Sequence, residues 1–266
     1  MKHIVCFSGG KDSTALILWA KENLHEFTTV FCDTGWEHPI TYAYVEEINQ
    51  QLLGGSLVRL KSQKYDGFVQ LSVLRGRVPS ATARFCTDEL KVRPMIAWLK
   101  TIDDEITVYQ GIRAQESEGR AKMPMSQWSD DYDAQIERPL LFWLAEQCFA
   151  IMAKYGVKPN PLYLIGMGRV GCFPCIMVNF RELRAIRQYP EVWEMLKARV
   201  LELEKLVGRS FWSPDDIPQR FHTGRDDNGA SFCWAGDVFK YIESVDMDQL
   251  PLLPARSCMS VYNLCE

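Results

Sequence analysis

Runs of apolar residues alternate with amphipathic stretches through the first part of the chain. Four short apolar or β-branched runs predict buried strands, at residues 2–7, 27–32, 56–60 and 106–109. Between them, apolar side chains recur at helical spacing, which predicts helices over residues 14–20, 39–53 and 88–100, the last with Thr87 as its N-cap. Strands separated by helices imply right-handed crossovers, so the pattern predicts an α/β fold with a Rossmann-like parallel sheet.

The pattern changes after residue 110. The predicted elements are an exposed polar loop over residues 126–135 and helices over residues 142–155, 178–207 with a break near Pro190, and 238–244. We therefore expect two parts, a sheet domain over residues 1–165 and a mainly helical C-terminal region over residues 166–266.

Composition limits the classes of protein that fit. Of the 266 residues, 47% are hydrophobic and 24% are charged, which is ordinary for a globular protein with a substantial core. A net charge of −4 gives no overall sign of nucleic-acid binding, and no apolar run approaches the roughly 20 residues of a membrane span. Because the first residues are predicted to form a strand, we expect no signal peptide. We therefore expect a cytoplasmic protein whose nine cysteines are reduced thiols, metal ligands or catalytic groups.

A glycine-rich loop follows the first strand and precedes the first helix. Glycines let the backbone turn tightly and bring N–H groups close to an anion, and the positive end of the helix dipole adds to the attraction. The predicted phosphate-binding residues are Ser8, Gly9, Gly10, Lys11, Asp12 and Ser13. Their spacing matches neither the Walker A pattern nor G-x-G-x-x-G. The alternative is a polar turn that binds no ligand.

Polar residues also follow two other predicted strands. They are Asp33, Thr34, Gly111, Arg113 and Arg120. Ligands of parallel sheets bind at the carboxyl ends of the strands, so we expect these residues beside the glycine-rich loop. An arginine there can hold phosphate or sulfate bidentately, unless it is only a solvated charge. Asp12 or Asp33 can orient a magnesium ion, and Asp33 can instead face ribose or adenine, or simply cap a turn.

The cysteines fall into two groups. Cys6, Cys32 and Cys148 lie in apolar contexts and are expected to be buried packing residues. Cys172 and Cys175 form a Cys-x-x-Cys pair, which suits zinc, an iron–sulfur cluster or a redox pair. Three further cysteines that can join them are Cys86, Cys258 and Cys265.

These motifs, taken in order, resemble the phosphoadenosine phosphosulfate (PAPS) reductase family of the PP-loop ATP pyrophosphatase superfamily. The chain looks most similar to reductase-like proteins of phages and prophages and to the sulfur-transfer enzymes of DNA phosphorothioation. The matching pieces are Ser8 to Ser13, Asp33-Thr34-Gly35, Cys86-Thr87 with Leu90-Lys91 and Pro94, Gly111-Ile112-Arg113 with Glu116-Ser117, Arg138-Pro139, Asn160-Pro161-Leu162-Tyr163, Gly171-Cys172 with Cys175, and the tail with Cys258 and Cys265.

The resemblance implies an adenine-nucleotide-binding PP-loop core, of the adenine nucleotide alpha hydrolase-like type, with a mainly helical extension. It implies an enzyme that binds ATP with Mg²⁺ and activates an acceptor by adenylation for sulfur chemistry, with Lys11, Asp12 and Arg113 as catalytic residues. The acceptor can be a nucleic acid, which would suit the basic run from Arg75 to Arg93, and a sulfur-donor protein is a possible partner. The alternatives are thiol-dependent reduction of PAPS or adenylyl sulfate, and a nucleotide-binding module without turnover.

Two departures from the family bear on these alternatives. The C-terminal Glu-Cys-Gly-Leu-His motif of the true reductases is absent, and Phe85-Cys86 stands where the cluster-bearing adenylyl-sulfate reductases have two adjacent cysteines. The paired glycines of the loop look more like those of an ATP-cleaving enzyme.

The resemblance also implies a four-thiolate iron–sulfur cluster of the 4Fe–4S type. Its expected ligands are Cys86, Cys172, Cys175 and one of the tail pair, Cys265 ahead of Cys258, with Cys233 as a weaker substitute. The sulfurs of Cys172 and Cys175 should then lie near that of Cys86. Zinc, or thiols without a metal, are the alternatives.

Overall fold

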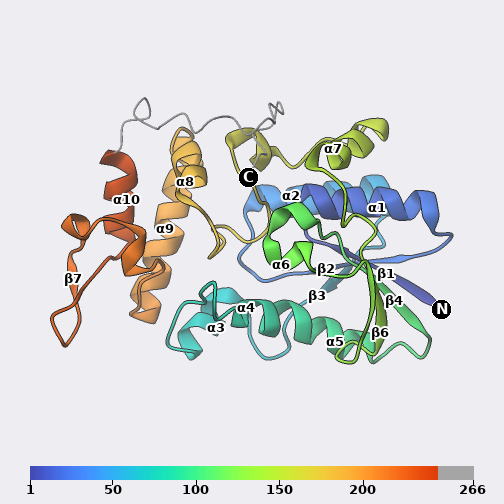
Figure 1. The fold of residues 1–266 in the computed structure, drawn as a ribbon, viewed down its shortest axis with the longest axis horizontal. Helices are drawn as coiled ribbons and strands as arrows, with labels where there is room; N and C mark the ends of the chain where they lie inside the picture. The colour runs from blue at the N-terminus through green and yellow to red at the C-terminus, as the bar shows by residue number, and fades with distance from the viewer. Residues whose placement is uncertain (245–266) are drawn as a thin grey trace.

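A computed structural model describes residues 1–244 of the protein. A six-stranded sheet forms its centre, in the order β3-β2-β1-β4-β6-β5 (Figure 1). The strands are β1 (Lys2–Phe7), β2 (Thr28–Cys32), β3 (Val58–Leu60), β4 (Ile106–Tyr109), β5 (Ser126–Ser129) and β6 (Ala134–Glu137). All neighbouring strands pair in parallel except β5, which runs antiparallel to β6. The predicted parallel sheet is therefore confirmed.

Helices cover both faces of this sheet (Figure 1). On one face α1 (Lys11–Asn23), α2 (Pro39–Leu53) and α7 (Ala145–Lys154) enclose an apolar cluster that includes Val5 and Phe7 of β1. On the other, α5 (Arg93–Leu99) packs against Ile4 of the same strand. Because successive side chains of a strand point to opposite faces, β1 is buried on both sides, as its continuous apolar run requires.

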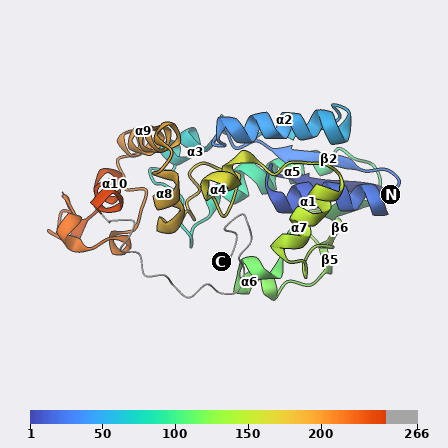
Figure 2. The same ribbon diagram turned by 90° about the horizontal axis from the view of Figure 1, so that it is seen from above.

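The C-terminal part is mainly helical, as predicted. Its helices α8 (Phe180–Ile186), α9 (Pro190–Val207) and α10 (Ala235–Ser244) gather at one end of the molecule (Figure 2). The predicted break lies between α8 and α9, where Pro190 occupies the first turn of α9. A third apolar cluster joins residues from these helices, such as Leu196, to Trp36 and Leu71 of the sheet part. The division between residues 165 and 166 stays a prediction, and this cluster contains residues from both sides of it.

The remaining elements are short. They are α3 (Phe68–Leu74), α4 (Phe85–Thr87), a π-helical turn η1 (Asp88–Val92), α6 (Glu118–Ala121), the 3-10 turns η2 (Ala114–Glu116), η3 (Pro161–Ile165), η4 (Pro214–Asp216) and η5 (Gln219–Phe221), and a hairpin of β7 (Gly224–Arg225) and β8 (Ser231–Phe232).

Two predicted elements were wrong. Residues 126–135 form most of the β5–β6 hairpin and not a loop, because only Ala134 and Ile136 of that hairpin are fully buried and an edge strand needs few apolar residues. Thr87 does not cap a helix, since its backbone is itself helical and the turn begins at Phe85. Among residues 1–244, no helix combines the length and the apolar character that crossing a membrane would need.

Candidate functional site

The glycine-rich loop lies at the carboxyl edge of the sheet, between β1 and the start of α1. Strand β1 is flanked by β2 on one side and β4 on the other, so the connections that leave these strands diverge at this point. Ligands of open α/β sheets bind in the crevice that such a divergence opens. The topology therefore places Asp33, which follows β2, and Gly111, which follows β4, on either side of the loop, as the sequence predicted.

Gly9 is the residue that lets the loop turn. Its φ is +78°, and a Cβ at this position would lie 2.9 Å from Cγ2 of Thr41 and 3.1 Å from Cγ2 of Val45. The Ser13 hydroxyl holds the turn closed, because its Oγ accepts from the Ser8 N–H at 3.1 Å and donates to the Gly10 carbonyl at 3.0 Å. The loop is thus anchored from within and packed tightly on α2.

A segment 150 residues further along the chain covers the loop. The Asn160 side-chain amide donates to the Gly9 carbonyl at 3.2 Å, and the Tyr163 hydroxyl accepts from the Lys11 backbone N–H at 2.9 Å. The Lys11 ammonium lies 5.3 Å from the centre of the Tyr163 ring and 3.5 Å from the Gly168 carbonyl. The Asn-Pro-Leu-Tyr motif, residues 160–163, therefore covers the loop, a role that its sequence does not reveal.

Asp12 and Arg113 form a buried ion pair beside the loop. The Arg113 Nε lies 2.5 Å from Asp12 Oδ1, and the Lys11 ammonium lies 3.3 Å from Asp12 Oδ2. Burial on its own would raise the pKa of Asp12, but Lys11 and Arg113 outweigh it and hold that pKa below the ordinary 3.8. Gly111 permits this approach, since a Cβ there would lie 3.0 Å from the Asp12 carbonyl oxygen. Asp12 therefore orients Arg113.

Cys148 has a polar contact that the sequence did not predict. It is fully buried, as expected, but its thiol also donates to Asp12 Oδ1 at 3.5 Å. Burial raises the pKa of this thiol well above its ordinary value. Cys6 and Cys32, the other two predicted packing residues, contact the apolar cluster on the opposite face of the sheet and are partly exposed. Arg120 forms an ion pair with Glu116.

Asp33 and Thr34 lie where predicted, directly after β2. Asp33 Oδ1 accepts from the Tyr42 hydroxyl at 2.6 Å and from the Gly35 N–H at 2.9 Å, and Asp33 Oδ2 pairs with the Lys61 ammonium at 3.0 Å. These contacts outweigh burial and lower the pKa of Asp33. The hydroxyl of Thr34 turns away from the loop and donates to Glu37 Oε1 at 2.6 Å.

The cysteine pair lies next to these residues. Cys172 Sγ is 3.5 Å from Thr34 Oγ1, and the backbones of Cys172 and Glu37 form an antiparallel bridge. Burial raises the pKa of the Cys172 thiol to about 11. Burial also raises the pKa of Cys86, and the nearby Cys175 adds to that shift. The pKa of Lys91 is raised, mainly by Cys172 and to a smaller extent by Glu37 and Cys175.

Only some of the expected cluster ligands lie among the described residues. Within residues 1–244, no three or more His, Cys, Asp or Glu side chains are grouped so that they could hold a metal ion. Cys86 and Cys172 contact the same apolar cluster, and Cys175 acts electrostatically on both. The other two expected ligands, Cys258 and Cys265, lie outside the described residues. Cys233 is buried and donates to the Ser213 carbonyl.

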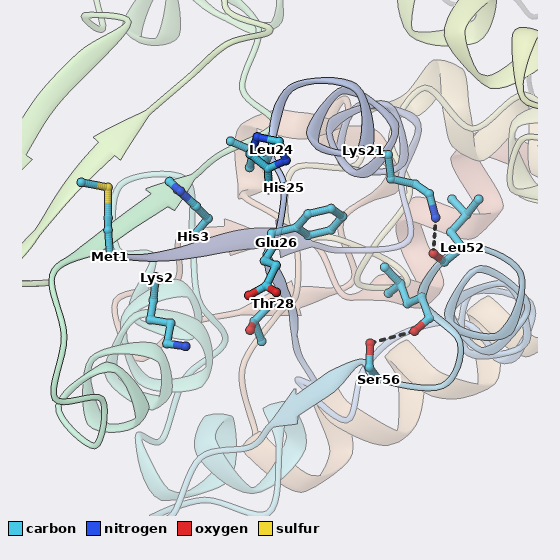
Figure 3. Close-up of a pocket in the computed structure, with 12 residues that line it drawn as sticks. Met1, Lys2, His3, Lys21, Leu24, His25, Glu26, Thr28, Leu52 and Ser56 are labelled. Atoms are coloured by element: carbon cyan, nitrogen blue, oxygen red, sulfur yellow. Dashed lines mark hydrogen bonds between the residues drawn. The ribbon is translucent and has the colours of Figure 1, made fainter.

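A pocket of about 560 Å³ lies at the amino ends of β1 and β2, away from the loop (Figure 3). Its lining includes Lys2, His3, Lys21, His25 and Glu26. Lys21 is already engaged by the Leu52 carbonyl at 2.6 Å, and His3 lies 3.1 Å from the Tyr109 hydroxyl. This pocket shares no residue with the predicted site.

Three comparisons place the chain among known proteins. An uncharacterized 37.8 kDa protein of Escherichia phage 186 is 37% identical, over 77% of this chain and 75% of its own length. The adenosine 5'-phosphosulfate reductase of Streptomyces coelicolor is 24% identical, over 64% of this chain and 70% of its own. The crystal structure of phosphoadenylyl-sulfate reductase from Candida auris in a phosphate complex matches with a TM-score of 0.53 and 17% identity, covering 66% of this chain and 83% of that one.

The last of these shows a shared fold, which agrees with the parallel sheet and the position of the loop. The family model "Phosphoadenosine phosphosulfate reductase domain" matches residues 2–178, which include the loop, the Asp12–Arg113 pair and both cysteines of the Cys-x-x-Cys motif. The chain therefore belongs to the phosphoadenosine phosphosulfate reductase domain family, as its motifs predicted.

Proposed function

We propose that this protein is an enzyme of the ATP pyrophosphatase type that binds an adenine nucleotide at the Ser8–Ser13 loop and adenylates an acceptor for sulfur chemistry. The observation that carries the proposal is the arrangement of charge at the loop. Lys11 and Arg113 both pair with Asp12 in the first turn of α1, where the helix dipole is positive, so two cations meet at the loop. The site is suited to phosphate.

Each residue of this site has a proposed part in the reaction. The backbone amides of the loop, with Ser8, Lys11 and Ser13, hold the departing pyrophosphate, and Arg113 stabilises charge on the phosphate under attack. Asp12 and the Gln115 side-chain oxygen, 3.1 Å from Arg113 Nη1, fix the direction of the guanidinium. Arg120 pairs with Glu116 through Nη1, and its remaining N–H groups are proposed to contact the nucleotide.

Two groups that the family implies have candidate ligands in this chain, although the described residues are not grouped as a metal site. Magnesium prefers carboxylate oxygens, and Asp33 is the carboxylate we assign to its shell or to the ribose, because Asp12 is already engaged by two cations. The thiols of Cys86, Cys172 and Cys175, with one tail cysteine, would hold an iron–sulfur cluster, which would supply electron transfer beside the nucleotide.

We assign the acceptor of the adenylyl group from the positively charged residues near Cys86. Arg75 pairs with Glu89, and the guanidinium groups of Arg75 and Arg77 lie 5.8 and 5.3 Å from the centre of the Phe85 ring, next to Cys86. Arginines around an aromatic ring are a usual surface for single-stranded nucleic acid, so we propose a nucleic-acid acceptor. We further propose that the protein works in the cytoplasm and that a second protein donates the sulfur.

A second candidate is thiol-dependent reduction of PAPS or adenylyl sulfate. It is favoured by the family and by the named activity of the Streptomyces coelicolor relative. A nucleotide-binding module without turnover is the third. In an assay with purified full-length protein, pyrophosphate release from ATP with a nucleic-acid acceptor supports adenylation, sulfite release from PAPS or adenylyl sulfate with a thiol supports reduction, and binding without either product supports the module.

A loop variant tests the site itself. Lys11→Ala should weaken ATP binding about 10-fold or more, the worth of one charge-assisted hydrogen bond, while the fold survives. Lys154→Ala is a matched control, since Lys154 is an exposed lysine that pairs with Glu22 far from the loop. Equal ATP affinity in the parent and Lys11→Ala would contradict the assignment.

A further inference from the structure

One hydroxyl group lies between two carboxylates at the carboxyl end of β2. The Tyr42 oxygen is 2.6 Å from Asp33 Oδ1 and 2.9 Å from Glu37 Oε2. A phenol carries a single proton, so Tyr42 can donate a full hydrogen bond to only one of the two carboxylates at a time. The Tyr42 hydroxyl therefore has two arrangements. In one it donates to Asp33, and in the other it donates to Glu37.

Glu37, one of the two acceptors, contacts the cysteine pair. It is 4% exposed, and its other oxygen, Oε1, accepts from Thr34 Oγ1 at 2.6 Å and lies 3.9 Å from Cys172 Sγ. Thr34 Oγ1 in turn lies 3.5 Å from the same sulfur. Any change in the hydrogen bonds at Glu37 therefore acts on the immediate surroundings of Cys172.

The backbone makes the same connection. The Phe173 N–H donates to the Trp36 carbonyl at 2.7 Å, and the Trp36 indole N–H donates to the Pro174 carbonyl at 2.9 Å. On the far side of Glu37, Arg199 of α9 donates to the Glu37 carbonyl at 3.0 Å. Residues 36 and 37 are thus bonded both to the cysteine segment and to α9. A shift of residues 36 and 37 is therefore transmitted to the cysteine segment, and a shift of that segment is transmitted to residues 36 and 37.

Asp33, the second acceptor, is the residue that the proposed function assigns to the nucleotide. A ribose hydroxyl or a magnesium shell that engages Asp33 Oδ1 competes with Tyr42 for that oxygen. Tyr42 is then left with Glu37 as its acceptor, which changes the hydrogen bonding of the carboxylate that lies beside Cys172. Both ends of the connection bias one two-state element, which is the physical requirement for coupling between sites.

We propose that Tyr42 is a positioning residue that couples nucleotide binding at Asp33 to the Cys172–Cys175 segment. The inference rests on the proposed nucleotide site and adds that the cysteine segment responds to its occupancy. Coupling of this kind is reciprocal. If the nucleotide changes the affinity of the cysteine segment for a bound group by some factor, that group must change nucleotide affinity by the same factor.

Hydrogen exchange of the full-length protein, read by mass spectrometry, tests the coupling whether or not a metal is bound. ATP should slow exchange of residues 170–178, which include the Phe173 N–H, by about five-fold or more in the parent. In Tyr42→Phe the same addition of ATP should change that exchange by less than about two-fold, while ATP still binds. Tyr155→Phe is the matched control, because its hydroxyl bonds only Glu22 on the surface, and it should respond like the parent.

The outcomes separate the two proposals. If the parent binds no adenine nucleotide in a direct binding assay, the proposed function and the coupling fall together. If it binds ATP but residues 170–178 do not respond, or if Tyr42→Phe responds as the parent does, the coupling is overturned and the proposed function stands. Loss of ATP binding in Tyr42→Phe would make Tyr42 a binding residue and would also overturn the coupling. Glu37→Leu, which offers Tyr42 no second acceptor, should repeat the result of Tyr42→Phe and serves if that variant does not fold.

Discussion

The glycine-rich loop and the Cys172–Cys175 segment lie at the same edge of the sheet but are built in different ways. The loop takes its shape from consecutive residues, since Gly9 turns the chain and Ser13 closes the turn onto Ser8 and Gly10. The cysteine segment takes its position from residues far away, because the Trp36–His38 segment supplies its backbone partners. A local motif fixes the first site, and tertiary contacts fix the second, so changes near each should have different consequences.

The largest effect is expected at the cysteine segment. Cys172→Ser should abolish bound iron and brown colour in anaerobically purified protein, because a serine hydroxyl is a poor replacement for a thiolate ligand. Cys6→Ser is the matched control, since Cys6 contacts the apolar cluster on the opposite face of the sheet. Iron content and the visible absorption spectrum are the measurements. Full iron content in Cys172→Ser would contradict the cluster hypothesis.

The next effect concerns Arg113. A lysine cannot reach Asp12 and Gln115 in two fixed directions as the guanidinium does, so Arg113→Lys should lose activity almost as severely as Arg113→Ala, by about 10- to 100-fold. The measurement is kcat/KM for whichever product the enzyme releases. Arg181→Lys, at an arginine outside the predicted site, is a control. Near-normal kinetics in Arg113→Lys would show that the bidentate geometry has no part in the reaction.

A smaller effect is expected from the backbone of the loop. Gly9→Ala combines a positive φ with contacts at 2.9 and 3.1 Å, and it should lower the free energy of unfolding by roughly 2 to 4 kcal/mol. Gly54→Ala shares the positive φ, at +61°, but a Cβ there meets nothing within 4 Å, so it should cost only about 1 kcal/mol. Urea unfolding measures both. Equal losses would mean that packing of the loop on α2 adds nothing.

The smallest effect concerns pH at the junction of the two regions. His38 is 2% exposed, and burial, with a smaller effect of Arg199, lowers its pKa from 6.5 to about 4. The unfolded state therefore binds a proton at higher pH than the folded state, and stability falls as the pH drops from 6.5 toward 4. His38→Asn keeps an N-cap acceptor for the Ile40 N–H but does not titrate, so about 1 to 3 kcal/mol of that fall should disappear. Unfolding free energies at pH 7 and pH 4.5 give the result, and an unchanged pH slope in His38→Asn would be the contrary one.

Local patterns predicted most of the fold. The bounds of β1, α2 and β4 agree with those expected from the sequence, because each is a continuous apolar run or a helix with clear ends at Pro39 and Gly54. The β5–β6 hairpin was missed because β5 is largely exposed and lacks the apolar residues that predict a buried strand. The N-cap at Thr87 was wrong because the chain is already helical from Phe85, and a π-helical turn follows directly.

The candidate site was predictable only in part, for the same reason. The loop, Asp33 and Arg113 could be found because strand ends in a parallel sheet share one edge. Tyr42 and Glu37 could not, since neither residue belongs to a motif and their roles depend on one hydroxyl reaching two carboxylates. The contact of Cys148 with Asp12 was equally hidden, because a cysteine in an apolar helix has the pattern of a packing residue.

The cover that Asn160 and Tyr163 place over the loop has a consequence for synthesis of the protein. The loop is synthesised before the segment that covers it, so its hydrogen bonds to Asn160 and Tyr163 must wait for about 150 more residues. At ribosomal speeds of about 5 to 20 residues per second, the interval is roughly 8 to 30 s. During that time the nascent chain carries the loop without its cover.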